Sequence, residues 1–326
     1  DDHGTNIPLV DRALLRRSHR TSKPRADRID TVSELTSNVT DTALIFEGGG
    51  MRASFSSGVL QVLLEAGIHC DWVGGISAGS SCLANYLARD GARAERSFVD
   101  FAAEPEFGNW RTWLQGKGVF NAEWIYERTS LPHQALPYPW ETFTSNPAQI
   151  AIGAMRCEDG EMVYWGRDDI NRLPDLMKRV RASSTMPLFM PLTTVDGEVY
   201  CDGALGPTGG FAVDAAKADG YEKFVVVMTR TRGYRKPPAR FPSGYRRLFR
   251  RYPAIAHGVL ERPANYNRTL DELFDLEREG RAFLIFPDAM PIKNSERRVP
   301  VLRSVFQSGR AKAESELDAL REFLGL

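Results

Sequence analysis

Short, unbroken apolar runs alternate with segments of helical periodicity from Thr42 onward. The run TALIF (residues 42–46) is typical of a strand buried on both faces, and residues 52–66 carry apolar side chains at helical spacing. A second run, CDWVGGI (70–76), precedes a second helical segment that we expect to end at Gly91. This order of strand, glycine turn and helix, present twice, predicts a parallel sheet with helices on its faces.

The second half of the chain contains further strand signals and one long helical signal. Two pairs of strand-like runs flank short turns, CEDG and Asp196-Gly197, so each pair predicts a hairpin. Two single apolar runs and a terminal amphipathic segment follow, at residues 223–230, 282–286 and 302–324. We therefore expect an α/β fold with a mostly parallel central sheet, in one domain over residues 41–326 with a C-terminal helical portion over about 235–326.

Residues 1–40 differ in composition from the rest of the chain. Their stretch RRSHRTSKPRADR is basic and almost free of apolar residues, which predicts a poorly ordered arm. They contain no signal-peptide h-region, and no apolar run in the chain approaches the ~18 residues that span a bilayer. The four cysteines have no C-x-x-C pair and no histidine at ligand spacing. We expect reduced, mostly buried thiols, no metal site, no cofactor and a cytoplasmic protein.

Overall composition and charge add little, but one segment is unusual. The chain is 42% hydrophobic, which suits a globular protein with a sizeable core, and its 42 basic and 42 acidic residues balance. The segment Arg230–Arg251 holds nine Lys and Arg and no acid, interleaved with Tyr and Phe. This pattern fits peripheral membrane contact and a solvated basic loop equally well. No other feature favours nucleic acid, so we expect no nucleic acid partner.

The second glycine turn carries a candidate nucleophile. Its sequence GISAG fits the pattern G-x-S-x-G, in which a serine stands at the apex of a sharp turn from strand to helix. Gly75 and Gly79 are small enough for that turn, and Ser77 would lie at a helix N-terminus, where free N–H groups stabilise an oxyanion. The alternative is that Ser77 merely caps an ordinary helix.

A serine hydroxyl needs a base, and Asp202 is the better of two candidates. It ends an alternating strand in VYCDGALG, and Gly203 and Ala204 leave room for close approach to the serine. A partly desolvated carboxylate can accept the proton directly. The order Ser77, Asp202, His257 also matches the triad of α/β-hydrolases, but His257 falls in a helical segment rather than a loop after a strand. Taken alone, DGA also fits a simple hairpin turn.

Together these motifs resemble the patatin-like phospholipase family. EGGGMR, GISAG, RASSTMPLFMPL and DGA match in order its glycine-rich oxyanion motif, its nucleophile elbow, its proline-containing segment and its catalytic aspartate. The motifs cover residues 43–232. The remaining sequence is similar to a bacterial cytoplasmic subgroup of patatin-like esterases.

The resemblance implies a three-layer α/β/α sandwich and a dyad of Ser77 and Asp202 without a catalytic histidine. It also implies that the protein hydrolyses acyl esters of lipids through an acyl-enzyme, with a lipid ester as its substrate. The oxyanion would be held by the glycine-rich loop, whose residues are Gly48, Gly49, Gly50, Met51 and Arg52. Which of their N–H groups face the substrate stays open, as does the oligomeric state.

Two other classes of function remain as alternatives. A small-ester esterase, thioesterase or acyltransferase would use the same chemistry without acting on membranes. A nucleotide- or lipid-binding protein without catalysis would use EGGG as a phosphate loop, but the loop lacks the Lys-Ser/Thr of a P-loop, and Ala53 replaces the third glycine of G-x-G-x-x-G. For an acyl chain, the candidate pocket residues are those of NWRTWLQGKGVF, where core packing is the competing role: Trp110, Trp113, Leu114 and Phe120.

Overall fold

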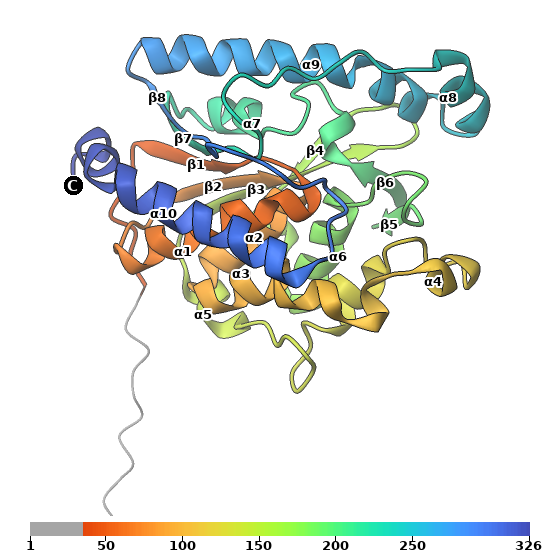
Figure 1. The fold of residues 1–326 in the computed structure, drawn as a ribbon, viewed down its shortest axis with the longest axis horizontal. Coiled ribbons are helices and arrows are strands. Elements are labelled where there is room, and N and C mark those ends of the chain that lie inside the picture. Colours follow the sequence, from red (N-terminus) through yellow and green to blue (C-terminus); the bar gives the residue numbers. More distant parts are fainter. Residues whose placement is uncertain (1–34) are drawn as a thin grey trace, which may run out of the picture. The chain divides into compact units, whose positions relative to one another are not determined.

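A computed structural model describes residues 35–326 of the chain. They form an eight-stranded sheet with helices on both faces (Figure 1). The basic arm expected over residues 1–40 lies outside the described residues up to position 34. Residues 38 and 39 already belong to the folded part, because Val39 is buried and the N–H groups of Asn38 and Val39 donate to the carbonyl of His69.

The sheet has a parallel centre and an antiparallel side. Its strands are β1 (Thr42–Phe46), β2 (Trp72–Ile76), β3 (Gln149–Arg156), β4 (Met162–Trp165), β5 (Thr193–Val195), β6 (Glu198–Asp202), β7 (Lys223–Val227) and β8 (Ala282–Ile285). Their order is β5-β6-β3-β2-β1-β7-β8, and β4 also pairs with β3. The run from β3 to β8 is parallel, whereas β4 and β6 are antiparallel to β3. The predicted α/β class with a mostly parallel sheet is confirmed.

Alternate residues of the central strands face opposite helical layers. In β1, Leu44 and Phe46 pack toward one layer, and Ala43 and Ile45 toward the other, which explains the unbroken apolar run. The first layer comprises α1 (Ala53–Glu65), α2 (Ala78–Leu87), α3 (Gly91–Phe98), α5 (Trp140–Ser145), α6 (Leu173–Ser183) and α10 (Val299–Leu324). The second comprises α7 (Val213–Ala218) and α9 (Pro253–Arg278). Two short helices, α4 (Trp110–Leu114) and α8 (Pro242–Leu248), lie at the margins of these layers (Figure 1).

One predicted helix boundary is wrong. Gly91 does not end the second helix: α2 ends at Leu87, and Gly91 is the first residue of α3. Arg89 turns the chain with a φ of 50°, and the carboxylate of Asp90 then accepts the N–H of Arg93 as a helix cap. The capping aspartate, rather than the glycine, decides where the new helix begins.

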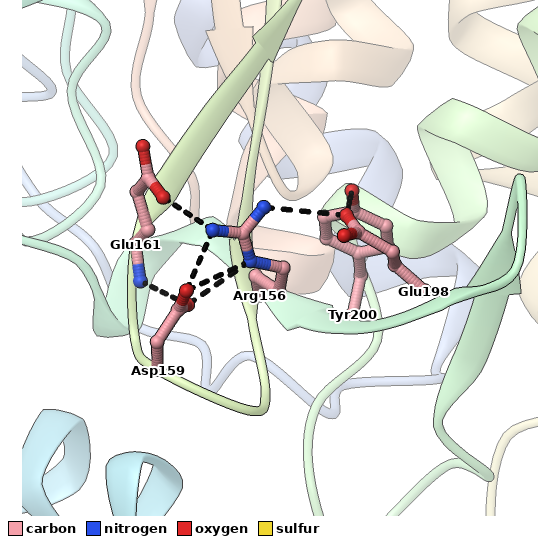
Figure 2. A network of polar contacts seen from close by, with 5 residues as sticks. All are labelled: Arg156, Asp159, Glu161, Glu198 and Tyr200. Atoms are coloured by element: carbon pink, nitrogen blue, oxygen red, sulfur yellow. Dashed lines mark hydrogen bonds and ion pairs between the residues drawn. The ribbon is translucent and has the colours of Figure 1, made fainter.

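An ion-pair network joins the two hairpins on the antiparallel side of the sheet (Figure 2). The guanidinium of Arg156, at the end of β3, pairs with Asp159 at 2.6 Å, with Glu161 and with Glu198 at 3.3 Å. Tyr200 donates its hydroxyl to Glu198 at 2.7 Å. Exposed pairs contribute little singly, but this one cation holds three acids from both hairpins. The network therefore helps to fix the register in which β6 runs toward its last residue, Asp202.

Candidate active site

Three chain segments meet where β1 and β2 end. The glycine-rich loop follows β1, Ser77 follows β2, and Asp202 ends β6. Ile76 lies opposite Gly153 of β3, and Asp202 lies opposite the next residue, Ala154. The register on the two sides of β3 therefore brings Ser77 and Asp202 together although 125 positions separate them in the sequence.

Ser77 occupies a strained turn. Its φ of 57° and ψ of −129° lie in a region that residues with side chains rarely adopt. A Cβ at Gly75 would lie 2.3 Å from the Gly79 carbonyl oxygen, and one at Gly79 would lie 2.1 Å from that of Phe46. Only glycine fits at these two positions, as the elbow interpretation requires.

The Ser77 hydroxyl donates a hydrogen bond to Asp202 in a nearly closed site. The distance from Oγ to Oδ2 is 2.8 Å, and Ser77 and Asp202 are 7% and 5% exposed. The other carboxylate oxygen accepts the N–H of Ala204 at 2.9 Å. A Cβ at Gly203 would lie 2.5 Å from the Gly153 carbonyl oxygen, so glycine is needed there as well.

Burial raises the pKa of Asp202. The charge of Arg262, the hydrogen bonds from Ala204 and Ser77, and the charge of Lys236 each oppose this rise. Desolvation is the larger effect, so the carboxylate binds a proton more readily than an exposed aspartate does. Such a group is suited to accept the proton of the hydroxyl beside it.

A second serine, Ser183, holds the backbone of Ser77 in place by a hydrogen bond. The hydroxyl of Ser183, at the end of α6, accepts the backbone N–H of Ser77 at 2.9 Å and donates to the carbonyl of Gly153 at 2.6 Å. The carbonyl of Thr185 accepts the N–H of Asp202 at 2.7 Å. Residues of the segment RASSTMP therefore hold both members of the pair, a role that the sequence did not reveal because it depends on backbone contacts.

Several N–H groups of the glycine-rich loop are already engaged. Those of Gly48, Met51 and Arg52 donate to the carbonyls of Gly210, Asn294 and Gly49. Within residues 35–326, the N–H groups of Gly49 and Gly50 donate no hydrogen bond. The N–H of Ala78, the first residue of α2, is likewise without a partner in the described chain. Gly48, Met51 and Arg52 therefore offer no free backbone donor, and among the five residues of the loop the N–H groups of Gly49 and Gly50 remain as candidates.

An apolar cavity adjoins the pair. It has an empty volume of about 840 Å³, part of it open to solvent, and Gly50, Ser77 and Ala78 contribute to its wall. The rest of the wall is mainly apolar: Met51, Phe98, Phe101, Phe107, Phe120, Ile125, Leu136, Met177, Val180, Met186 and Met190. A mainly apolar wall with a few polar groups is typical of small-molecule sites.

Only one of the four residues considered for an acyl pocket lines this cavity. Phe120 is buried in its wall. Trp110, Trp113 and Leu114 are 67%, 57% and 66% exposed, so they neither line the cavity nor pack in the core. Their apolar periodicity reflects α4, a short helix whose apolar side chains face solvent and whose Thr112 is buried.

No histidine approaches the pair among residues 35–326. His257 is exposed on α9 and borders a different hollow, whose wall includes neither Ser77 nor Asp202. The carboxylate of Asp202 accepts hydrogen bonds from Ser77 and Ala204 instead. In the described part of the chain, no cluster of His, Cys, Asp and Glu is arranged to hold a metal ion.

Comparisons with known proteins agree with these motifs. The model of a family described as Patatin-like phospholipase matches residues 44–216, and a domain of unknown function (DUF6363) matches residues 252–325. The uncharacterized protein YjjU of Escherichia coli K12 is 25% identical over 198 residues, 57% of this chain and 51% of YjjU. The chain thus spans about half the length of this relative. VipD from Legionella pneumophila is similar in structure, with a TM-score of 0.45 and 12% identity over 86% of this chain and 67% of VipD.

The raised pKa of Asp202 predicts a cost in stability at neutral pH. The folded state holds the proton more tightly than the unfolded chain, so stability falls as the pH rises through the folded-state pKa. Asp202→Asn escapes this loss. We expect its free energy of unfolding in urea, relative to wild type, to rise as the pH increases above about 4, the pKa of an unfolded aspartate. The exposed control Asp168→Asn should show no such trend, and a difference independent of pH for Asp202→Asn would contradict the burial argument.

Proposed function

This chain belongs to the patatin-like phospholipase family, and we propose that it is a serine hydrolase that cleaves carboxylic esters of lipids with Ser77 and Asp202. The observation that carries the proposal is the 2.8 Å hydrogen bond from the hydroxyl of Ser77 to the buried carboxylate of Asp202. The backbone of Ser77 is held at a positive φ, as a nucleophile elbow requires. Family membership supports the class of reaction, and the apolar cavity beside the pair supports a substrate with a hydrocarbon part.

The first half of the reaction forms an acyl-enzyme. Asp202 accepts the proton as Ser77 Oγ attacks the ester carbonyl carbon, and the carbonyl oxygen becomes an oxyanion. The free N–H groups of Gly49, Gly50 and Ala78 are the donors that we assign to this oxyanion. The bond from carbon to the alcohol oxygen then breaks, and the alcohol leaves with the proton that Asp202 held.

The second half releases the acid. A water molecule attacks the acyl carbon, and Asp202 accepts a proton from it. The same N–H groups hold the second oxyanion until the bond to Ser77 Oγ breaks. The proton on Asp202 then returns to Ser77, which restores both groups to their starting state.

Exposed apolar side chains outside the cavity offer a surface that could bind lipid. Trp110, Trp113 and Leu114 are exposed. A few residues later, the N–H of Val119 donates to the carbonyl of Phe189 at 2.7 Å. The side chain of Phe189 is half exposed. Phe189 precedes Met190, which lines the cavity, so this apolar surface reaches its wall. No helix within residues 35–326 is long and apolar enough to cross a bilayer. We propose that contact with lipid is peripheral.

The basic segment Arg230–Arg251 offers a second contact for a membrane. Phe241, just before helix α8, and Leu248, at its end, are 81% and 55% exposed, and the helix also carries the exposed Arg246 and Arg247. Apolar side chains among cations are typical of segments that lie at an anionic membrane surface. Membrane contact through this segment stays a prediction.

The dyad can be tested with a soluble p-nitrophenyl ester. We expect Ser77→Ala and Asp202→Asn to lower kcat by a factor of about 10⁴ or more, because each removes a group that the chemical step requires. The control His257→Ala should keep the wild-type rate, and circular dichroism should show all three variants folded. Wild-type activity in Asp202→Asn together with loss in His257→Ala would contradict the dyad.

Acyl chain length separates a lipid hydrolase from a small-ester esterase, thioesterase or acyltransferase. An apolar cavity should favour longer chains, since each buried CH₂ contributes about 0.8 kcal/mol. We expect kcat/KM to rise from acetyl to octanoyl esters and the enzyme to release fatty acid from phospholipid vesicles. A preference for acetyl esters with no release from vesicles would favour the small-ester alternative.

A further inference from the structure

Four cationic side chains gather behind the glycine-rich loop. Arg52 ends this loop in the short helix Gly50–Arg52, Arg230 and Lys236 lie in the loop between β7 and α8, and Arg262 belongs to α9. Burial, together with the charges of Arg230 and Arg262, lowers the pKa of Arg52 to about 10, although the charge of Glu47 opposes this shift. Burial and the charges of Arg262, Arg52 and Arg230 likewise lower the pKa of Lys236 to about 7. Lys236 therefore lies close to all three arginines, and Arg52 lies close to the other two.

None of these four side chains has an acid or hydrogen-bond partner within residues 35–326. Arg52 is only 6% exposed, yet its Nε donates no hydrogen bond, and the buried Nε atoms of Arg230 and Arg262 are also unpartnered. Elsewhere in the fold, Arg179 and Arg181 also have an unpartnered Nε, but their terminal nitrogens pair with Asp196 at 2.8 Å and with Glu127 at 2.6 Å. A buried guanidinium without a partner is costly, and three partly buried cations without partners lie around it, so this place calls for an anion.

The nearest carboxylates are committed to other groups. Glu47 raises the pKa of Arg52 and Lys236, but its oxygens accept the Tyr266 hydroxyl at 3.0 Å and the N–H of Thr229. The charges of Arg262 and Lys236 act to lower the pKa of Asp202, but its oxygens accept hydrogen bonds from the Ser77 hydroxyl and the N–H of Ala204. Two carboxylates therefore face four cations, and neither carboxylate forms an ion pair with any of them.

Two tyrosines line the same region. The guanidinium of Arg230 lies 4.2 Å from the ring centre of Tyr234, and Nζ of Lys236 lies 4.4 Å from that of Tyr266. The rings of Tyr234 and Tyr266 meet edge to face at 6.1 Å. Aromatic faces hold cations in place without neutralising them. The cationic groups of the cluster are thus held in place, but no acid neutralises their charge.

The cluster lies where open α/β sheets bind ligands. β1 and β7 are parallel neighbours, and Glu47 and Met228 follow directly at their carboxyl ends. Ligands of such sheets bind outside these ends. A Cβ at Gly48, next to Glu47, would lie 3.0 Å from the Cβ of Ser77, so the loop that carries Arg52 also adjoins the nucleophile candidate.

We propose that Arg52, Arg230, Lys236 and Arg262 form an anion site that takes a phosphate group beside Ser77 and Asp202. A phosphate offers several oxygens and one to two negative charges, which suits guanidinium groups that each present more than one donor. The phosphate belongs either to the headgroup of a phospholipid substrate or to free phosphate. The first source rests on the proposed function, and the second does not.

Binding of inorganic phosphate tests the site without catalysis. We would titrate phosphate into the full chain with Ser77→Ala at constant ionic strength and measure Kd by calorimetry. Adding Arg262→Gln or Lys236→Gln should raise Kd about tenfold or more, because each removes a charged hydrogen-bond donor. Lys236→Arg keeps the charge and should retain binding. Arg240→Gln, an exposed arginine of the same basic segment, should leave Kd within about twofold.

Hydrolysis of short-chain lipids distinguishes the two sources. We would measure kcat/KM for monomeric dibutyryl phosphatidylglycerol and for dibutyrylglycerol, which lacks the phosphate. The ratio to compare is kcat/KM for dibutyryl phosphatidylglycerol divided by kcat/KM for dibutyrylglycerol. If the phosphate is carried by the substrate, Arg262→Gln should lower this ratio about tenfold, and Arg240→Gln should not change it. If the site holds free phosphate, the ratio should stay constant while phosphate binding is lost.

The proposal is overturned if wild type and variants bind millimolar phosphate equally or not at all and the ratio does not change. Failure of the proposed function has a different signature. In that case neither lipid nor p-nitrophenyl ester is hydrolysed, but the calorimetric comparison still decides whether the cluster binds phosphate.

Discussion

The hydrogen bond from Ser77 to Asp202 sets the demands that the surrounding structure meets. A carboxylate and a hydroxyl come together at 2.8 Å in a nearly closed site, from strands that lie on either side of β3. This requires a fixed register of β2 and β6 against β3, a positive φ at Ser77, and glycines at 75, 79 and 203, where any side chain would clash. Strain and desolvation are therefore concentrated at one point of the sheet.

Neighbouring residues offset the free-energy cost of burying and straining this pair. Ser183 satisfies the N–H of Ser77, Thr185 satisfies that of Asp202, and Ala204 donates to the carboxylate. The cations Arg262 and Lys236 offset part of the rise in the pKa of Asp202. They belong to the same cluster for which we infer a phosphate ligand, so occupancy of that cluster would alter the electrostatic environment of the base. Chemistry and anion binding would then be coupled through charge.

Local patterns in the sequence predicted the strands and the glycine-flanked turn at Ser77, and they favoured Asp202 over His257 as its partner. Buried parallel strands leave unbroken apolar runs, and the elbow needs glycines at fixed positions, so both are visible in short windows. Gly91 was misjudged because a capping aspartate one residue earlier starts a new helix there. The exposure of Trp110 could not be foreseen, since helical spacing does not reveal which face is covered.

Features that depend on distant contacts were not visible in the sequence. The occupied N–H groups of Gly48 and Met51 depend on Gly210 and Asn294, more than a hundred positions away. Arg230 and Lys236 lie in one loop, but Arg52 and Arg262 come from the short helix Gly50–Arg52 and from α9, so no short window of the sequence contains all four cations. Arg52 was conspicuous beside three glycines, but only the fold shows that it is buried without a partner.

Covalent labelling with a fluorophosphonate tests the central claim most directly, because it reports the activated nucleophile without any assumption about the substrate. After labelling and digestion, mass spectrometry should place the adduct on Ser77, and Asp202→Asn should be labelled far more slowly than wild type, while His257→Ala keeps the wild-type rate. An adduct on another residue, or labelling of Asp202→Asn at the wild-type rate, would contradict the account.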